Sequence, residues 1–178
     1  MTRAWFVFIV AMAGAFAAGW AGAQGTRGAA LSGQDYAEIE MLMSRYNQAV
    51  DFEDRDMIDS IWTDDAVWAI HPARISPNGA RVEGRESIVN MYVQRWAARP
   101  QQHERRHWQN NLVVTPTAGG ATSRVYVVSF EVSYSPPKPA LSGHYDDVLV
   151  RTPDGWRIKE RILTLDTPLR EEVFGYVW

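Results

Sequence analysis

The sequence ATSRVYVVSFEVSY, residues 121–134, alternates regularly along its length and predicts a long β-strand. Similar runs occupy residues 105–115, 143–151 and 156–166, and turn sequences rich in proline and glycine separate them. No helical periodicity interrupts this part of the chain. The C-terminal half is therefore expected to form an antiparallel sheet of long strands.

Period-two alternation assigns the side chains of these strands to two faces. Within 121–134, one face carries Tyr126, Val128, Phe130, Val132 and Tyr134, and the other carries Val125, Val127, Ser129 and Glu131. Within 105–115, the same rule puts His107 and Asn111 on one face and Trp108 on the other. In the last strand it groups Arg161 with Arg157 and Lys159, so one side of the sheet is expected to face water.

The N-terminal half shows helical periodicity instead. A helix is expected to start at Ser32 or Gln34, with a buried stripe formed by Tyr36, Ile39, Met43, Tyr46 and Val50. Asp54 is the expected N-cap of a short helix over 54–62, and Pro100 is expected to end a third helix over 85–99. Between them, Asp64 and Asp65 indicate a turn, followed by strands over 66–70 and 80–83 around a loop over 72–79.

Together these elements predict an α+β fold. The expected architecture is a curved, cone-shaped antiparallel sheet whose concave side is closed by three N-terminal helices. The hollow end of such a cone is a natural binding cavity.

The first residues have the composition of a secretory signal peptide. Arg3 is followed by an uncharged run over 4–23 that ends in Ala21-Gly22-Ala23, the small-residue pattern that signal peptidase needs. We expect cleavage after Ala23; the alternative is a retained membrane anchor. The mature protein is then expected to be periplasmic or secreted, without membrane contact. It would comprise a flexible segment over 24–33 and a single domain over 34–178.

Composition and charge narrow the class of ligand. A formal net charge of -3, a pI near 5.8 and scattered arginines argue against a nucleic-acid partner. The chain has no cysteine, so no disulfide braces it in an oxidising compartment. Eight tryptophans, seven tyrosines and six phenylalanines fit either a well-filled core or a pocket for a flat molecule. The expected ligand is a small apolar molecule.

Asp51 and His107 are the leading candidates for chemistry. Asp51 follows the last residue of the first helical stripe, and His107 lies near the start of a strand. A carboxylate that holds one nitrogen of an imidazole lets the other nitrogen move a proton at neutral pH. The alternatives are that Asp51 caps the helix or pairs with Arg55, and that His107 is a partly buried structural residue.

Other residues are candidates for contact with a ligand. Tyr46 is either a third catalytic group or a core residue of its helix. His144 is either a binding residue or a member of a solvated cluster with Asp146 and Asp147. The remaining candidates are Trp68, Met91, Trp96, Asn111, Tyr134 and Tyr145. His103 and His107 have the spacing of a helical metal motif but lie in strand-like sequence, so no metal site is expected.

Several phrases resemble the SnoaL-like branch of the nuclear transport factor 2-like superfamily, over residues 34–166. They are Tyr46-Asn47-Gln48-Ala49-Val50-Asp51, Ile61-Trp62-Thr63-Asp64-Asp65-Ala66-Val67-Trp68, Gly84-Arg85-Glu86-Ser87-Ile88, Arg106-His107-Trp108-Gln109-Asn110-Asn111 and Asp154-Gly155-Trp156-Arg157-Ile158. The resemblance implies a cone-shaped fold, a deep apolar pocket, no organic cofactor and a homodimer through the outer sheet face. Members include scytalone dehydratase, polyketide cyclases, ketosteroid isomerase and the small subunits of ring-hydroxylating dioxygenases.

Two positions carry over from the dehydratase pattern of this family. Asp51 matches its acid, and His107 matches the histidine at the start of its first long strand. Val50 stands where that pattern has a tyrosine, and the next strand has no matching second histidine. The resemblance implies a cofactor-independent lyase, dehydratase or isomerase. The alternative is a ligand-binding or structural subunit, and an exported chain fits a dioxygenase subunit poorly because the electron donors of those enzymes are cytoplasmic.

Overall fold

The computed structural model describes residues 30–71, 81–99 and 104–166. Its elements are α2 (Gly33–Asp51), α3 (Arg55–Asp59), β1 (Trp62–His71), β2 (Arg81–Glu83), α4 (Arg85–Ala98), β3 (Arg105–Thr117), β4 (Gly120–Glu131), β5 (Lys138–Thr152) and β6 (Gly155–Leu165). The predicted signal peptide over 1–23, the first part of the segment over 24–33, the loop over 72–79 and the tail after residue 166 lie outside the described residues. In the described part of the chain, no helix combines the length and the apolar character needed to cross a membrane.

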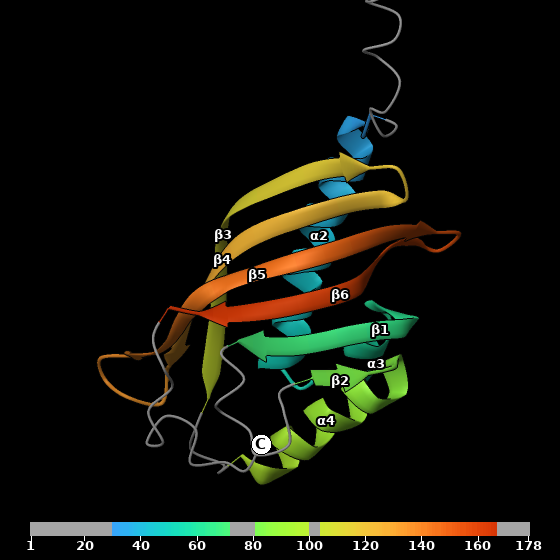
Figure 1. Cartoon of the computed structure of the whole chain (residues 1–178). Helices are drawn as coiled ribbons and strands as arrows, with labels where there is room; N and C mark the ends of the chain where they lie inside the picture. The colour runs from blue at the N-terminus through green and yellow to red at the C-terminus, as the bar shows by residue number, and fades with distance from the viewer. Residues whose placement is uncertain (1–29, 72–80, 100–103, 167–178) are drawn as a thin grey trace, which may run out of the picture.

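The strands form one curled, open sheet in the order β2-β1-β6-β5-β4-β3. Figure 1 shows α2 lying across one face of this sheet, with α4 beside β1 and β2. The strands from β3 to β6 pair antiparallel with their sequence neighbours, as expected. β1, however, pairs parallel with β6, which the expectation of a wholly antiparallel sheet missed. The α+β architecture with N-terminal helices against a curved sheet is confirmed.

The helices begin where the sequence indicates. Ser32 caps α2 in a capping box with Asp35, and the Asp54 side chain accepts the backbone N–H of Met57 at the start of α3. The expected stripe of α2 is buried except for Tyr36, which is 43% exposed. α3 ends at Asp59, and the residues expected to form a turn, Asp64 and Asp65, lie within β1. The register between β1 and β6 shifts between Trp62 and Val67, and Asp64 and Asp65 lie within this irregular part of the strand. Their turn-like composition therefore belongs to a strand irregularity and not to a turn.

A β-bulge in β3 reverses the predicted face of every later residue in that strand. The register with β4 shifts by one residue between Asn110 and Val113, and Asn111 has a φ of 60°. Because one extra residue is inserted, His107 and Asn111 no longer share a face. Asn111 is exposed, and Leu112 replaces it on the inner side. The predicted common face was therefore wrong.

A second β-bulge places Arg161 on the opposite side of β6 from the one predicted. Its register with β5 shifts after the pairing of Leu149 with Ile158, so Glu160 faces Val148. The extra residue turns Arg161 to the inner side, where it is fully buried. The prediction that Arg161 lies on the solvent-facing side of the sheet was wrong, although Lys159 is exposed as expected.

The inner face of β4 follows the predicted alternation. Val125, Val127, Ser129 and Glu131 are buried, while Tyr126 on the opposite face is 55% exposed. β4 ends at Glu131, so Val132 and Tyr134 do not extend its outer face. The core thus lies between the inner sheet face and the helices.

Candidate active site

Asp51 and His107 meet where the end of α2 lies against the start of β3. The imidazole Nδ1 is 2.5 Å from Asp51 Oδ1, and the backbone N–H of His107 donates to Asp51 Oδ2 at 2.9 Å. The side chains are only 6% exposed for Asp51 and 14% for His107. The contact expected from the sequence is therefore present, and Asp51 does not pair with Arg55 as the alternative proposed.

This geometry determines which ring nitrogen is available for chemistry. An ionised carboxylate can only accept hydrogen bonds, so Nδ1 carries the proton of a neutral imidazole next to Asp51. Nε2 is then the proton acceptor of the ring. The second hydrogen bond, from the His107 backbone, fixes the carboxylate relative to the strand and so limits rotation of the pair.

A second contact between the same two elements lies beside the first. Gln109 Nε2 donates to Asn47 Oδ1 at 2.7 Å. Asn47 precedes Asp51 by one helical turn, and Gln109 follows His107 by two residues, so each pair shares a face of its element. Sequence reasoning missed Asn47 and Gln109. The sequence signal that could have found them is their spacing: Asn47 and Asp51 are four residues apart on the helix, and His107 and Gln109 are two residues apart on the strand.

β4 supplies the groups on the other side of His107. Ser129 is the cross-strand neighbour of His107 and is 1% exposed. Glu131 pairs across the strands with Arg105, whose Nε lies 2.5 Å from the Glu131 carboxylate. Neither Ser129 nor Glu131 was a predicted site residue, because only the strand register reveals their position.

Tyr46, which precedes Asp51 on α2, belongs to a buried group of tyrosines from three different elements. Its hydroxyl is 2.6 Å from that of Tyr92, and its ring meets that of Tyr145 edge to face at 5.6 Å. Burial raises the pKa of Tyr92 and Tyr145 well above 10, so these hydroxyls keep their protons. Tyr46 and Tyr145, predicted as site residues, thus lie together, and their hydroxyls already take part in a buried network.

A buried ion pair borders this tyrosine group. The Arg161 guanidinium lies 4.1 Å from the Tyr46 ring and 4.3 Å from the Tyr145 ring. It donates to Asp147 through Nε at 2.7 Å and Nη2 at 2.8 Å, with both side chains fully buried. Burial by itself would lower the pKa of Arg161, but the charge and hydrogen bonds of Asp147 outweigh it and raise the pKa. Arg161 therefore remains a cation inside the protein.

Aromatic residues of β1 and α4 lie next to the same group. The Arg95 guanidinium lies 4.7 Å from the Trp68 ring, and burial lowers its pKa to about 10. Trp96 packs against Tyr92 at 6.0 Å between ring centroids, and Met91 packs against the core. The predicted ligand contacts Trp68, Met91 and Trp96 thus border one aromatic region.

Three predicted contact residues lie elsewhere. Tyr134 lies beyond the end of β4, is 41% exposed and has its ring 4.1 Å from Lys138 Nζ. His144 lies on the outer sheet face, 3.4 Å from Asp146, because adjacent strand residues point to opposite faces and Tyr145 points inward. Asn111 is exposed at the β3 bulge. His103, the other member of the rejected metal motif, lies outside the described residues.

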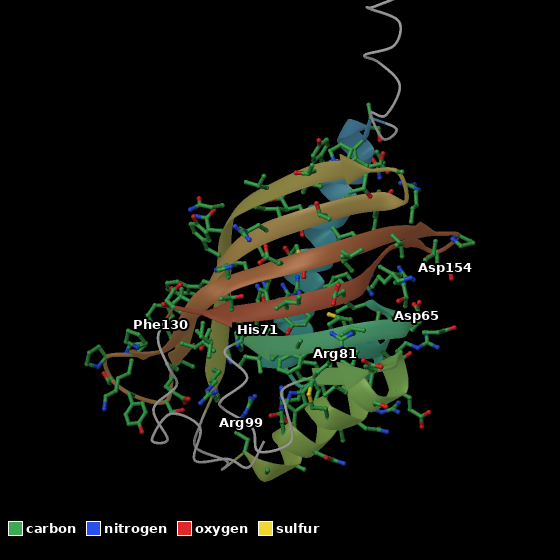
Figure 2. All side chains as sticks on the ribbon, viewed as in Figure 1. Asp65, His71, Arg81, Arg99, Phe130 and Asp154 are labelled. Atoms are coloured by element: carbon green, nitrogen blue, oxygen red, sulfur yellow. The ribbon has the colours of Figure 1, made fainter. Side chains whose placement is uncertain are left out.

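The outer sheet face carries exposed apolar side chains, two of them aromatic. Trp108, Tyr126 and Val113 are 64%, 55% and 63% exposed. Phe130, labelled in Figure 2 near the end of the sheet where β3 bends, packs 4.7 Å from Trp108 between ring centroids. Two open hollows of about 720 and 700 Å³ follow this face and share Asn111, Arg124 and Tyr126 in their linings. The outer sheet face thus carries an exposed apolar surface.

A third hollow, of about 500 Å³, runs between α2 and β3. Its lining includes Asn47 and Gln109 but neither Asp51 nor His107. The Asn47–Gln109 hydrogen bond therefore lies at this groove, whereas the Asp51–His107 pair does not line it.

Comparison with known proteins identifies the family. A model of the SnoaL-like domain matches residues 32–162. The small subunit of anthranilate 1,2-dioxygenase from Burkholderia cepacia is 28% identical over 141 residues, which cover 73% of this chain and 86% of that protein.

Solved structures with low sequence identity share the fold. A protein of unknown function with a cystatin-like fold from Nostoc punctiforme superposes with a TM-score of 0.66 at 19% identity, covering 78% of this chain and 96% of its own. A proposed scytalone dehydratase from Novosphingobium aromaticivorans gives a TM-score of 0.60 at 19% identity, covering 76% and 89%. The curled sheet, the N-terminal helices and the extent of the domain match agree: the chain belongs to the SnoaL-like domain family.

Proposed function

We propose that the protein is a cofactor-independent lyase, dehydratase or isomerase in which His107 moves a proton on a small apolar substrate. The observation that carries this proposal is the shielded hydrogen bond between His107 Nδ1 and Asp51. Asp51 fixes the ring orientation and stabilises the imidazolium that forms when Nε2 accepts a proton. A proton acceptor held in this way suits chemistry at neutral pH.

An aromatic region formed by β1 and α4 supports an aromatic or polycyclic substrate. Trp68, Tyr92 and Trp96 provide flat apolar surfaces along β1 and α4. Aromatic rings prefer stacked or edge-to-face contacts with other rings, which favours planar ligands. The structural relative from Novosphingobium aromaticivorans, a proposed scytalone dehydratase, agrees with this reaction class.

We also propose that the protein works as a homodimer in the periplasm or outside the cell. The exposed Trp108, Val113 and Tyr126 on the outer sheet face support the dimer, because a second copy would remove this apolar surface from water. The compartment follows from the signal-like residues 1–23.

The test is a search for turnover with the purified mature protein and matched variants. A panel of aromatic and alicyclic hydroxyketones is incubated in deuterated water, and mass spectrometry detects deuterium uptake or loss of water. Because a positioned acid or base contributes about 10²- to 10⁴-fold, His107→Ala and Asp51→Asn are each expected to lose activity by that factor. Circular dichroism checks that both variants fold. Full activity of a folded His107→Ala protein would refute the mechanism.

One observation favours a second function. The sequence relative from Burkholderia cepacia is the small subunit of a dioxygenase, so this chain is alternatively a structural subunit or a ligand-binding module without turnover. Purification from the native source, followed by native mass spectrometry, separates the two functions. A stable large partner, together with an inactive isolated dimer, would favour the subunit.

A further inference from the structure

We propose that Ser129 donates a hydrogen bond to the substrate oxygen next to the proton that His107 moves. The inference rests on the proposed function and names a residue for it. Such a reaction needs a donor for the oxygen that gains negative charge. Among the candidate residues from the sequence, Tyr46, Asn111 and Tyr145 carry a hydroxyl or amide group that can donate to it. None of these three has a hydrogen-bonding group available next to His107.

The tyrosine hydroxyls already have partners, and Asn111 is exposed to solvent. Tyr46 and Tyr92 are hydrogen-bonded at 2.6 Å, and Tyr145 interacts with Tyr46 and lies against Arg161. Asn111 is exposed at the β3 bulge, four residues along the strand from His107. The donor must therefore come from another residue on the inner face.

Strand register places Ser129 beside His107. The two residues are direct partners across the antiparallel β3–β4 pair. Both point to the inner face, as the burial of Val127, Ser129 and Glu131 shows. Cβ atoms of direct cross-strand partners are roughly 4.5–5.5 Å apart. A substrate atom in contact with the imidazole is therefore within reach of the Ser129 hydroxyl.

The Ser129 hydroxyl is buried and has no hydrogen-bond partner among the residues that the structure describes. The residue is 1% exposed, and no described donor or acceptor forms a hydrogen bond with its Oγ. Gln109 Oε1, on the same inner face, is likewise buried without a hydrogen-bond partner in the described ranges. Native proteins satisfy nearly all buried polar atoms, so two unsatisfied atoms that flank one histidine indicate a place where a polar ligand binds.

Ser123 shows what a structural serine on this strand looks like. It lies on the same inner face of β4, is 5% exposed, and donates to Asp147 Oδ2 at 3.0 Å. Ser123 and Ser129 are thus similar in burial and differ in hydrogen bonding. This contrast makes Ser123→Ala the matched control for Ser129→Ala.

The assigned step conserves atoms and charge. When Nε2 of His107 takes a proton from the carbon beside a carbonyl, the electrons of the C–H bond form an enolate whose charge lies on oxygen. The Ser129 O–H donates to that oxygen and keeps its own proton. Such a donor acts most strongly where charge develops in a water-poor site.

The test uses 4-nitrophenol, whose oxygen can share its proton with His107 and accept from Ser129. Its dissociation constant is measured by spectrophotometric titration of the mature protein and variants. Loss of a hydrogen bond to a charged oxygen predicts roughly ten- to hundredfold weaker binding for Ser129→Ala. Ser129→Thr should restore most of the affinity, Ser129→Cys should not, and Ser123→Ala should bind as the wild type does.

The outcomes separate this inference from the proposed function. If Ser129→Ala binds normally while His107→Ala does not, the role of Ser129 is refuted and the function stands. If the wild type does not bind, or if His107→Ala binds equally well, both fail. Should Ser129→Ala not fold, the difference between the threonine and cysteine variants decides the matter.

Discussion

Replacing Arg161 by methionine is expected to destabilise the protein strongly. The change removes the cation that satisfies Asp147 through two hydrogen bonds, in a pair whose side chains are both fully buried. Asp147 would keep the hydrogen bond from Ser123 but would remain a buried charge without a counterion. Removing one partner of a buried pair typically costs about 3–5 kcal/mol, because the remaining charge cannot reach water.

The chain provides a matched control one strand away. Arg124 and Asp146 also form a two-bond pair between adjacent strands, at 2.6 and 3.0 Å, but their side chains are 60% and 37% exposed. Solvent screens such a pair, so Arg124→Met is expected to change stability little. Both substitutions replace arginine by methionine, and they differ only in how deeply the ion pair is buried.

Urea unfolding measures the free energy of unfolding of both variants and thermal unfolding measures their Tm, each followed by circular dichroism and tryptophan fluorescence. For a protein of this size, a loss of about 3–5 kcal/mol lowers the Tm by roughly 6–20 °C. The double variant Arg161→Met with Asp147→Leu should recover part of the loss, because no charge is then left unpaired. Equal losses for Arg161→Met and Arg124→Met would refute the argument that burial governs the effect.

The remaining predictions concern pH and association. Hydrogen bonds from Ser32, with those from Trp156 and the charge of Arg151, lower the pKa of Asp35 to about 2 from 3.8. Because the pKa of Asp35 is depressed in the folded state, its stabilisation is present above pH 3.8 and is lost as the pH falls toward 2. Asp35→Asn should therefore destabilise the protein at neutral pH and less near pH 2. Unfolding measurements at the two pH values test this. Trp108→Glu places a charge on the exposed outer face and should shift a dimer to monomer in sedimentation velocity, whereas an unchanged oligomer would exclude this face as the interface.

Much of the site was predictable because its two main residues lie at the ends of strongly patterned elements. The stripe of α2 indicated where the helix ends and therefore where Asp51 lies, and alternation placed His107 near the start of β3. The residues around them were not predictable in the same way. Ser129 becomes the neighbour of His107 only through the β3–β4 register, which depends on hydrogen bonds between distant parts of the chain.

The sequence by itself determined the local features: the capped starts of α2 and α3, the long alternating strands and the inner face of β4. These depend on interactions between residues close together in the chain. Only the tertiary structure decided the parallel pairing of β1 with β6, the exposure of Asn111 at the β3 bulge and the burial of Arg161. A single inserted residue reverses the faces of all later strand residues, and its position depends on the partner strand rather than on local composition.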